Sequence, residues 1–140
     1  MGNGETYIKM CDCPEIQSTH TWGDGDFYWW SLDKQIHISY TARYDDYIVQ
    51  SPEAWDSIGD RRVIWLPRQD QIQEMLHGYF LEVGCWEGSI ILQAVFSGWI
   101  RDNGGYLIKS GLNKASMEQL WLAFLMKEKY SKTWSGKEWV

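Results

Sequence analysis

Residues 116–129 constrain the fold most, because they predict a helix that is apolar on nearly all sides. Ser116 and Gln119 have the spacing of a capping box, and Lys127 and Lys129 suit the last turn. The apolar residues are Met117, Leu120, Trp121, Leu122, Phe124, Leu125 and Met126. Such a helix must be covered on more than one side. We therefore expect a sheet on one side of it and, on the other, the C-terminal turn of residues 134–139 or another subunit.

A second helix is predicted over residues 67–77. Pro67 suits the first helical position, where its missing N–H costs nothing. The buried stripe of this helix follows the i, i+3, i+4, i+7 spacing and consists of Ile72, Met75, Leu76 and Tyr79. Gly78 is expected to end the helix as its C′ residue.

The rest of the chain shows short runs of β-type residues. Residues 27–30 and 36–40 flank a polar break, which predicts a β-hairpin with Ile36, Ile38 and Tyr40 alternating onto one face. Further strands are expected at residues 6–10, 47–50, 61–66, 80–83, 89–96, 99–100 and 106–109. The 140 residues are therefore predicted to form one α+β domain, residues 1–140, with the two main helices packed on an antiparallel sheet of about six or seven strands.

Charge is distributed unevenly along the chain. The total is −6, but residues 1–60 carry 11 acidic and 3 basic side chains, whereas residues 103–140 carry 3 acidic and 6 basic ones. An acidic N-terminal half argues against nucleic acid as the partner, because phosphate binding needs clustered Lys and Arg. A basic protein surface remains an alternative for that half. No apolar run is long enough to span a bilayer, so we expect a soluble, cytoplasmic protein without a membrane partner.

The sequence lacks the motifs of common enzyme classes. The phosphate-binding patterns G-x-G-x-x-G and G-x-x-x-x-G-K-[ST] are absent, as are G-x-S-x-G and H-E-x-x-H. Cys11 and Cys13, with His20 and His37, are candidate zinc ligands, but C-x-C is tighter than the usual spacing and no second pair follows. We therefore predict free thiols, no metal, no cofactor and no enzymatic activity.

Aromatic residues are the unusual feature of the composition, with 10 Trp, 8 Tyr and 4 Phe. Their density beside carboxylates in the N-terminal third is hard to bury in one small core. Aromatic rings are enriched at protein–protein hot spots, although they also stabilise sheets as cross-strand pairs and stack on nucleobases. The predicted binding residues are Trp22, Asp24, Asp26, Tyr28, Trp29, Trp30, Tyr44, Asp45 and Asp46.

Two segments carry a resemblance to a known family. These are IWLPRQDQIQEM at residues 64–75 and SMEQLWLAFLMKEKY at residues 116–130. There the chain resembles a family of small uncharacterised proteins of bacterial phages and prophages, and residues 11–17, 22–28 and 134–140 fit the same pattern. The resemblance covers about half of the chain. It implies a phage accessory protein, without catalytic residues to carry over.

Together these observations predict a phage-encoded accessory binding protein in the bacterial host cytoplasm. We expect it to bind a host protein and to inhibit a bacterial defence system without catalysis. The alternatives are a structural or housekeeping phage protein and a sponge that sequesters a nucleotide messenger. Because the last helix and the aromatics exceed what one small core can cover, we also expect a homo-oligomer, namely a dimer.

Overall fold

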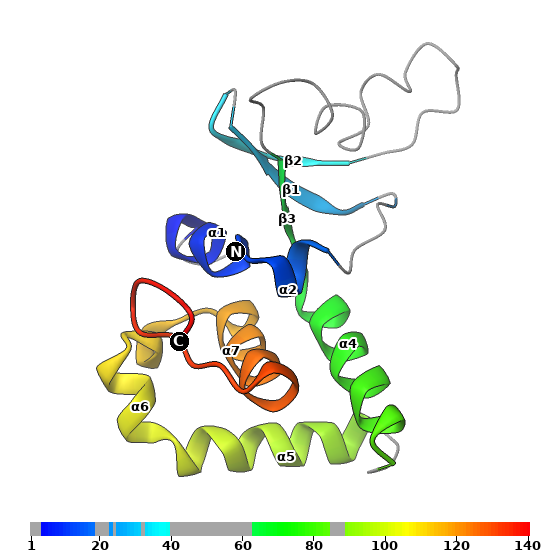
Figure 1. Cartoon of the computed structure of the whole chain (residues 1–140), viewed down its shortest axis with the longest axis vertical. Helices are drawn as coiled ribbons and strands as arrows, with labels where there is room; N and C mark the ends of the chain where they lie inside the picture. Colours follow the sequence, from blue (N-terminus) through cyan, green and yellow to red (C-terminus); the bar gives the residue numbers. More distant parts are fainter. Residues whose placement is uncertain (1–3, 19–22, 24, 32, 40–62, 85–88) are drawn as a thin grey trace. The chain divides into compact units, whose positions relative to one another are not determined.

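The chain divides into two compact units. The computed structural model describes residues 4–18, 23, 25–31, 33–39, 63–84 and 89–140 (Figure 1). Residues 1–10 and 69–140 form one unit, here called the helical unit, and residues 11–68 form the other, the sheet unit. The expectation of one domain stays a prediction, and the two units are described separately below.

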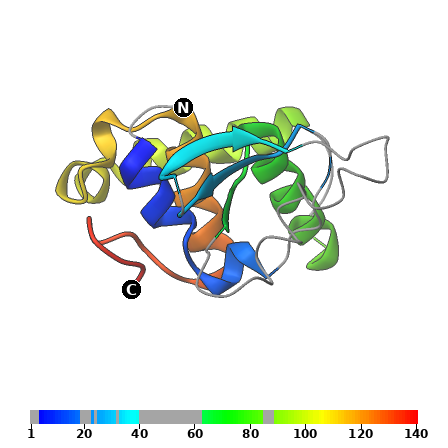
Figure 2. The same cartoon turned by 90° about the horizontal axis from the view of Figure 1, so that it is seen from above.

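The described part of the sheet unit contains three antiparallel strands. These are β1 (Phe27–Trp30), β2 (Gln35–Ile38) and β3 (Val63–Leu66), in the order β2-β1-β3 (Figure 2). The predicted hairpin is confirmed, because β1 pairs with β2 from Phe27↔Ile38 to Trp30↔Gln35. The strand predicted at residues 61–66 is confirmed as β3. Tyr40 and the strand expected at residues 47–50 lie outside the described residues.

The outer edge of β3 is covered by one side chain. Gln17 ends the short helix α2 (Pro14–Gln17), and its carboxamide reaches Trp65 in the middle of β3. The backbone N–H of Trp65 donates to Gln17 Oε1 over 2.9 Å, and Gln17 Nε2 donates to the Trp65 carbonyl over 3.0 Å. The carboxamide thus replaces the peptide group of a neighbouring strand and satisfies both edge groups.

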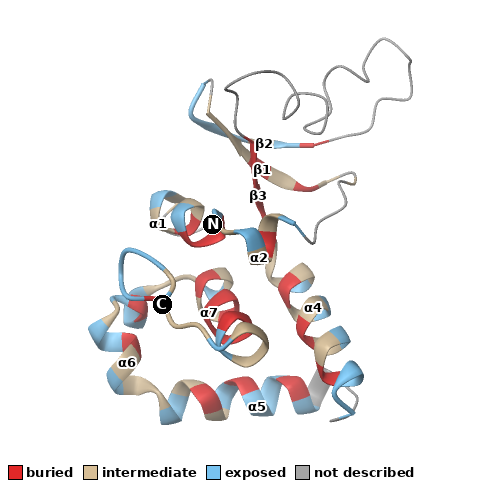
Figure 3. Ribbon diagram, in the orientation of Figure 1, coloured by how far each residue is buried: buried red, intermediate tan, exposed pale blue. Residues whose placement is uncertain are grey.

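The helical unit is built around α7 (Met117–Tyr130), as its sequence predicts. Ser116 Oγ accepts from the backbone N–H of Gln119, and Gln119 Oε1 accepts from the backbone N–H of Ser116 at 2.8 Å, so the capping box is present. Residues 121–126 are all buried (Figure 3). Within this unit α7 packs against α4 (Gln69–Glu82) and α5 (Ser89–Asp102). Neighbouring helices therefore cover part of the apolar circumference of α7.

Aromatic rings fill the core of the helical unit. The Phe96 ring of α5 stacks on Trp121 with 3.7 Å between centroids, and Phe124 meets Phe96 edge-on at 5.5 Å. Trp99 lies 5.3 Å from Phe124 and contacts Tyr106 of α6 (Gly104–Lys109). These rings of the C-terminal half are therefore core residues.

The C-terminal tail closes the helical unit. Trp134 and Trp139 form an antiparallel bridge with their rings 5.1 Å apart. The backbone N–H of Trp134 donates to the Tyr106 hydroxyl at 2.8 Å, and Trp139 Nε1 donates to the Met10 carbonyl of α1 (Gly4–Cys11) at 2.8 Å. The tail thus joins α6 to the N-terminal helix. Between α6 and α7 lies the 3₁₀ helix η2 (Leu112–Lys114).

The prediction of six or seven strands is wrong. The sheet has three strands among the described residues, and segments expected as strands are helical: residues 6–10 in α1, 80–82 in α4, 89–96 and 99–100 in α5, and 106–109 in α6. The reason is visible in α5, where Leu92, Phe96 and Trp99 follow the i, i+4, i+7 spacing and are buried. Burial of this stripe outweighs the weak β propensity of the β-branched residues beside it, Ile91, Val95 and Ile100.

Gly78 also differs from its prediction. It lies inside α4, which continues to Glu82, and it does not end the helix. Phe80, one turn after Leu76, is buried and extends the stripe of Ile72 and Leu76. Glycine in a helix interior costs only about 1 kcal/mol relative to alanine, which the burial of one phenylalanine exceeds.

Candidate functional site: the β-hairpin surface

One face of the sheet carries only apolar side chains. Because side chains alternate along a strand and opposite residues share a face, β1, β2 and β3 place six residues together. This set, here called the apolar face, consists of Phe27, Trp29, Ile36, Ile38, Ile64 and Leu66. Ile64 and Leu66 are buried, Trp29 is half-buried, and Ile36 and Ile38 of β2 are 39% and 57% exposed. The apolar face therefore becomes accessible towards β2.

The opposite face centres on His37. Its ring stacks on Tyr28 with 5.3 Å between centroids, and Trp30 meets it edge-on at 6.2 Å. Asp33 Oδ2 lies 2.6 Å from His37 Nε2, while Asp33 Oδ1 accepts from the backbone N–H of Gln35 at 3.0 Å. One carboxylate thus fixes both the hairpin turn and the imidazole. These contacts hold the strand ends that carry the apolar face.

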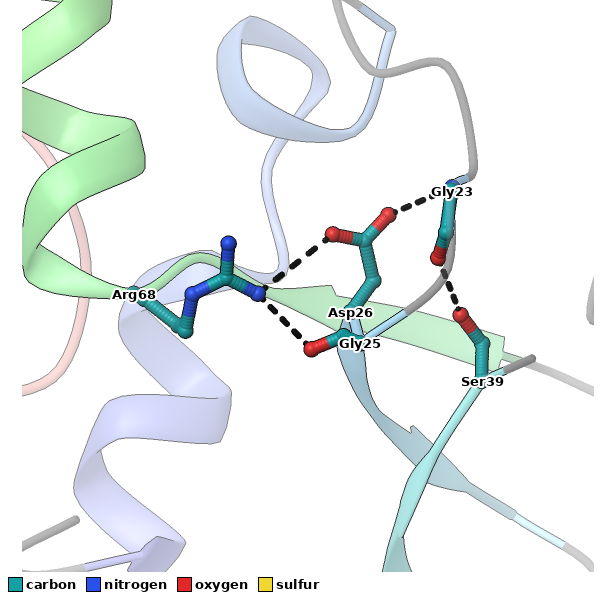
Figure 4. Close-up of polar contacts among 5 residues, drawn as sticks. All are labelled: Gly23, Gly25, Asp26, Ser39 and Arg68. Carbon is teal, nitrogen blue, oxygen red and sulfur yellow. Dashed lines mark hydrogen bonds and ion pairs between the residues drawn. The ribbon is translucent and has the colours of Figure 1, made fainter.

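A polar cluster holds the chain where it enters β1 (Figure 4). Asp26 is 4% exposed, and its Oδ2 accepts from the backbone N–H of Gly23 at 2.7 Å. Arg68 Nη1 lies 3.8 Å from Asp26 Oδ1 and donates to the Gly25 carbonyl at 2.7 Å. Ser39 Oγ donates to the Gly23 carbonyl at 2.7 Å. Gly25 has φ of 86°, a left-handed conformation that favours glycine.

The structure separates the predicted binding residues into three groups. Asp26 and Tyr28 are buried and hold the hairpin, whereas Trp29 and Trp30 are half-buried. The others lie outside the described residues, namely Trp22, Asp24, Tyr44, Asp45 and Asp46. Buried Asp26 and Tyr28 cannot contact a partner without rearrangement, because their side chains are already enclosed.

Ile36 and Ile38 are exposed on the apolar face, and the predicted binding residues do not include them. The alternation of Ile36, Ile38 and Tyr40 predicted that the isoleucines share one face, and the register confirms this for the two of them. That face is solvent-accessible at β2. The sequence signal was therefore present, but without the strand order it did not show that β2 lies at an edge.

A separate cavity of about 320 Å³ lies between α4 and α5 in the helical unit. Its described lining consists of Asp70, Gln73, Glu74, His77, Leu92 and Gln93. The first four follow the i, i+3, i+4, i+7 spacing, so helical periodicity alone was a signal for this polar stripe. The acidic side chains disfavour anionic ligands in this cavity.

The cysteines and the candidate metal ligands are characterised by their burial and grouping. Cys11 is buried and Cys13 is half-buried. His20 lies outside the described residues. Within the parts of the chain that the structure describes, no three His, Cys, Asp or Glu side chains are grouped in a way that suits a metal ion.

Two further observations bear on function. In the described segments, no helix has the length and apolar character needed to cross a membrane. No protein-family model matches the chain, and no curated protein or solved structure matches it. Functional inference therefore depends on the surfaces described above.

Proposed function

We propose that this protein is a non-enzymatic binding protein that contacts a partner protein through the apolar face of its sheet. The observation that carries this proposal is the cross-strand pair of Trp29 and Ile36, flanked by the exposed side chain of Ile38. Tryptophan is enriched at interface hot spots because one ring contributes a large area at a low entropy cost. A rigid strand pair presents these side chains without a loop having to be ordered on binding.

The chemistry of the hairpin supports binding over catalysis. Catalysis requires a nucleophile or an acid–base pair beside an accessible space. The accessible side chains of the apolar face, Ile36 and Ile38 with the half-buried Trp29, carry no titratable group. These groups can bury area against a partner but cannot move a proton.

The resemblance to phage and prophage proteins supplies the biological context of the proposal. In that context the partner is a protein of the bacterial host, and its inhibition would disarm a defence system in the host cytoplasm. The net charge of −8 in residues 1–60 favours a basic partner surface, because opposite potentials accelerate association. The proposal also includes a homo-oligomer, a dimer, as the active form.

A nucleotide sponge is less well supported than a protein partner. The cavity between α4 and α5 contains Asp70 and Glu74, and carboxylates repel the phosphates of a nucleotide messenger. The apolar face contains aliphatic side chains at its accessible edge, which suit a protein surface better than a charged small molecule.

Affinity capture from bacterial lysate tests the proposal. The bait proteins are the wild type, Trp29→Ala, Ile38→Asp and the control Ile108→Asp, which alters an apolar residue of the helical unit that is 67% exposed. We expect one host protein to be retained by the wild type and the control, and to be lost with the two hairpin variants. With that protein purified, Trp29→Ala should raise Kd by about 30-fold or more.

Stability measurements keep this test interpretable. If Trp29→Ala lowers the free energy of unfolding as much as it weakens binding, Trp29 is a structural residue and not a contact. Equal retention of the partner by Ile38→Asp and Ile108→Asp would show that the apolar face is not the binding surface. Either result would overturn the proposal.

A further inference from the structure

The two edges of the sheet differ in how their backbone groups are satisfied. At the β3 edge, the N–H and C=O of Trp65 are both bonded to the Gln17 carboxamide. At the other edge, β2 pairs with β1 and with no other described strand. One edge is therefore covered by a side chain that imitates a strand, while no described strand pairs with the other edge, along β2.

The register shows which residues of β2 point outwards. The backbone N–H of Ser39 donates to the Asp26 carbonyl at 2.7 Å, so residue 39 faces β1. Facing and outward residues alternate along an antiparallel strand, so His37 also faces β1. The N–H and C=O groups of Ile36 and Ile38 consequently point away from the sheet. The two outward-bonding residues are thus the two exposed isoleucines.

Charge, proline and a bulge, three devices that protect edge strands, are absent from the four described residues of β2. Natural edge strands carry charged residues, proline or a bulge, each of which blocks pairing with another chain. The sequence of β2 is Gln-Ile-His-Ile, which contains no proline and no acidic, lysine or arginine residue. Its pairing with β1 is continuous over four residue pairs, without a bulge. This edge is therefore competent to accept a further strand.

We propose that β2 pairs antiparallel with β2 of a second copy of this chain, around a two-fold axis at the sheet edge. Within β2, only residues 36 and 38 have backbone N–H and C=O groups that point outwards. A two-fold pairing that joins these groups places Ile36 of each copy opposite Ile38 of the other. Their side chains meet on one face, so the apolar faces of the two copies join into one surface. No charged side chain of β2 opposes its counterpart, and each copy supplies the same donors and acceptors.

The inference identifies the interface of the dimer included in the proposed function, and it rests on that part of the proposal. The joined sheet has six strands, three from each copy. Trp29, Ile36 and Ile38 of both copies then lie on one continuous surface centred on the two-fold axis. A partner protein would meet twice the apolar area that a single chain offers.

Hydrogen exchange combined with sedimentation tests the pairing. From micromolar to millimolar concentration, the wild type should reach twice the 16.5 kDa of one chain, and the amides of Ile36 and Ile38 should become protected in parallel. Ile38→Pro removes an outward N–H and should remain monomeric. The control Ile38→Val keeps that N–H and should still dimerise. Ile36→Lys, which leaves the backbone unchanged, should also be monomeric because it places charge at the interface.

The outcomes separate this inference from the proposed function. A wild-type monomer at all concentrations overturns the pairing, and so does a dimer in which the amides of Ile36 and Ile38 exchange rapidly. If Ile38→Pro unfolds the hairpin, the oligomeric state of Ile36→Lys is the deciding measurement. A dimer of the Ile36→Lys variant would refute the proposed interface. The capture experiment with Trp29→Ala tests binding to a host protein and does not measure the oligomeric state. Binding to a partner can therefore fail while the dimer is confirmed, or the reverse.

Discussion

Truncation of Phe124 to alanine is the strongest test of the core of the helical unit. Phe124 has no exposed surface and contacts the rings of Phe96, Trp99 and Trp121 at centroid distances of 5.5, 5.3 and 6.1 Å. Phenylalanine-to-alanine changes in cores cost about 3–5 kcal/mol, and each lost aromatic pair adds to the cost of the cavity. We expect Phe124→Ala to lower the free energy of unfolding by about 4 kcal/mol, a large part of the stability of a small domain.

Urea denaturation followed by far-ultraviolet circular dichroism measures this loss, because α7 and its neighbours dominate the helical signal. Phe124→Leu keeps most of the volume and should cost about 1.5 kcal/mol. Met117→Ala alters an exposed residue of the same helix and should change stability by about 0.5 kcal/mol or less. A loss below about 1 kcal/mol for Phe124→Ala, or one equal to that of Met117→Ala, would refute a fully packed position.

Three further predictions concern polar groups. Gln17→Leu removes both hydrogen bonds from the Gln17 carboxamide to the backbone of Trp65. Urea denaturation should show a free energy of unfolding lower by about 2 kcal/mol. An unchanged value would mean that these two hydrogen bonds do not stabilise the β3 edge. Asp26→Ala should cost a similar amount, about 2 kcal/mol, because it removes a charged acceptor from a buried loop and a partner from Arg68, and an unchanged melting temperature would contradict this. Burial raises the pKa of Tyr106 above 10.0, so its stabilising contribution is complete below pH 10.0 and is lost as the pH rises through its higher folded-state pKa. Tyr106→Phe should therefore lose less stability than the wild type between neutral and strongly alkaline pH, and identical pH profiles would refute the role of this phenol.

The proposed partner surface and the proposed dimer interface consist of different groups of the same hairpin. The side chains of Trp29, Ile36 and Ile38 project from the face of the sheet, whereas the outward backbone groups of Ile36 and Ile38 lie in its plane. One strand can therefore pair with a second copy and still present its side chains to a partner. Trp29→Ala alters the face and leaves the β2 backbone unchanged, whereas Ile38→Pro removes an outward N–H of β2 together with one apolar side chain of the face.

Local sequence determined the elements whose signals agree with one another. The capping box at Ser116 and the continuous apolar run to Met126 define α7, because cap, charge placement and periodicity all favour a helix there. The hairpin of β1 and β2 follows from two β-rich runs around a short polar turn. These features depend on contacts between residues that are close in sequence.

Only the tertiary structure decided the rest. Residues 89–102 contain enough β-branched and aromatic side chains to predict strands, but burial of Leu92, Phe96 and Trp99 against their own unit makes this segment a helix. Tertiary packing also buried Asp26 and left Ile38 exposed, although composition alone assigned binding to the former. The physical reason is the same in both cases: the burial of a side chain depends on neighbours that are distant in sequence, and local propensity is too weak to oppose it.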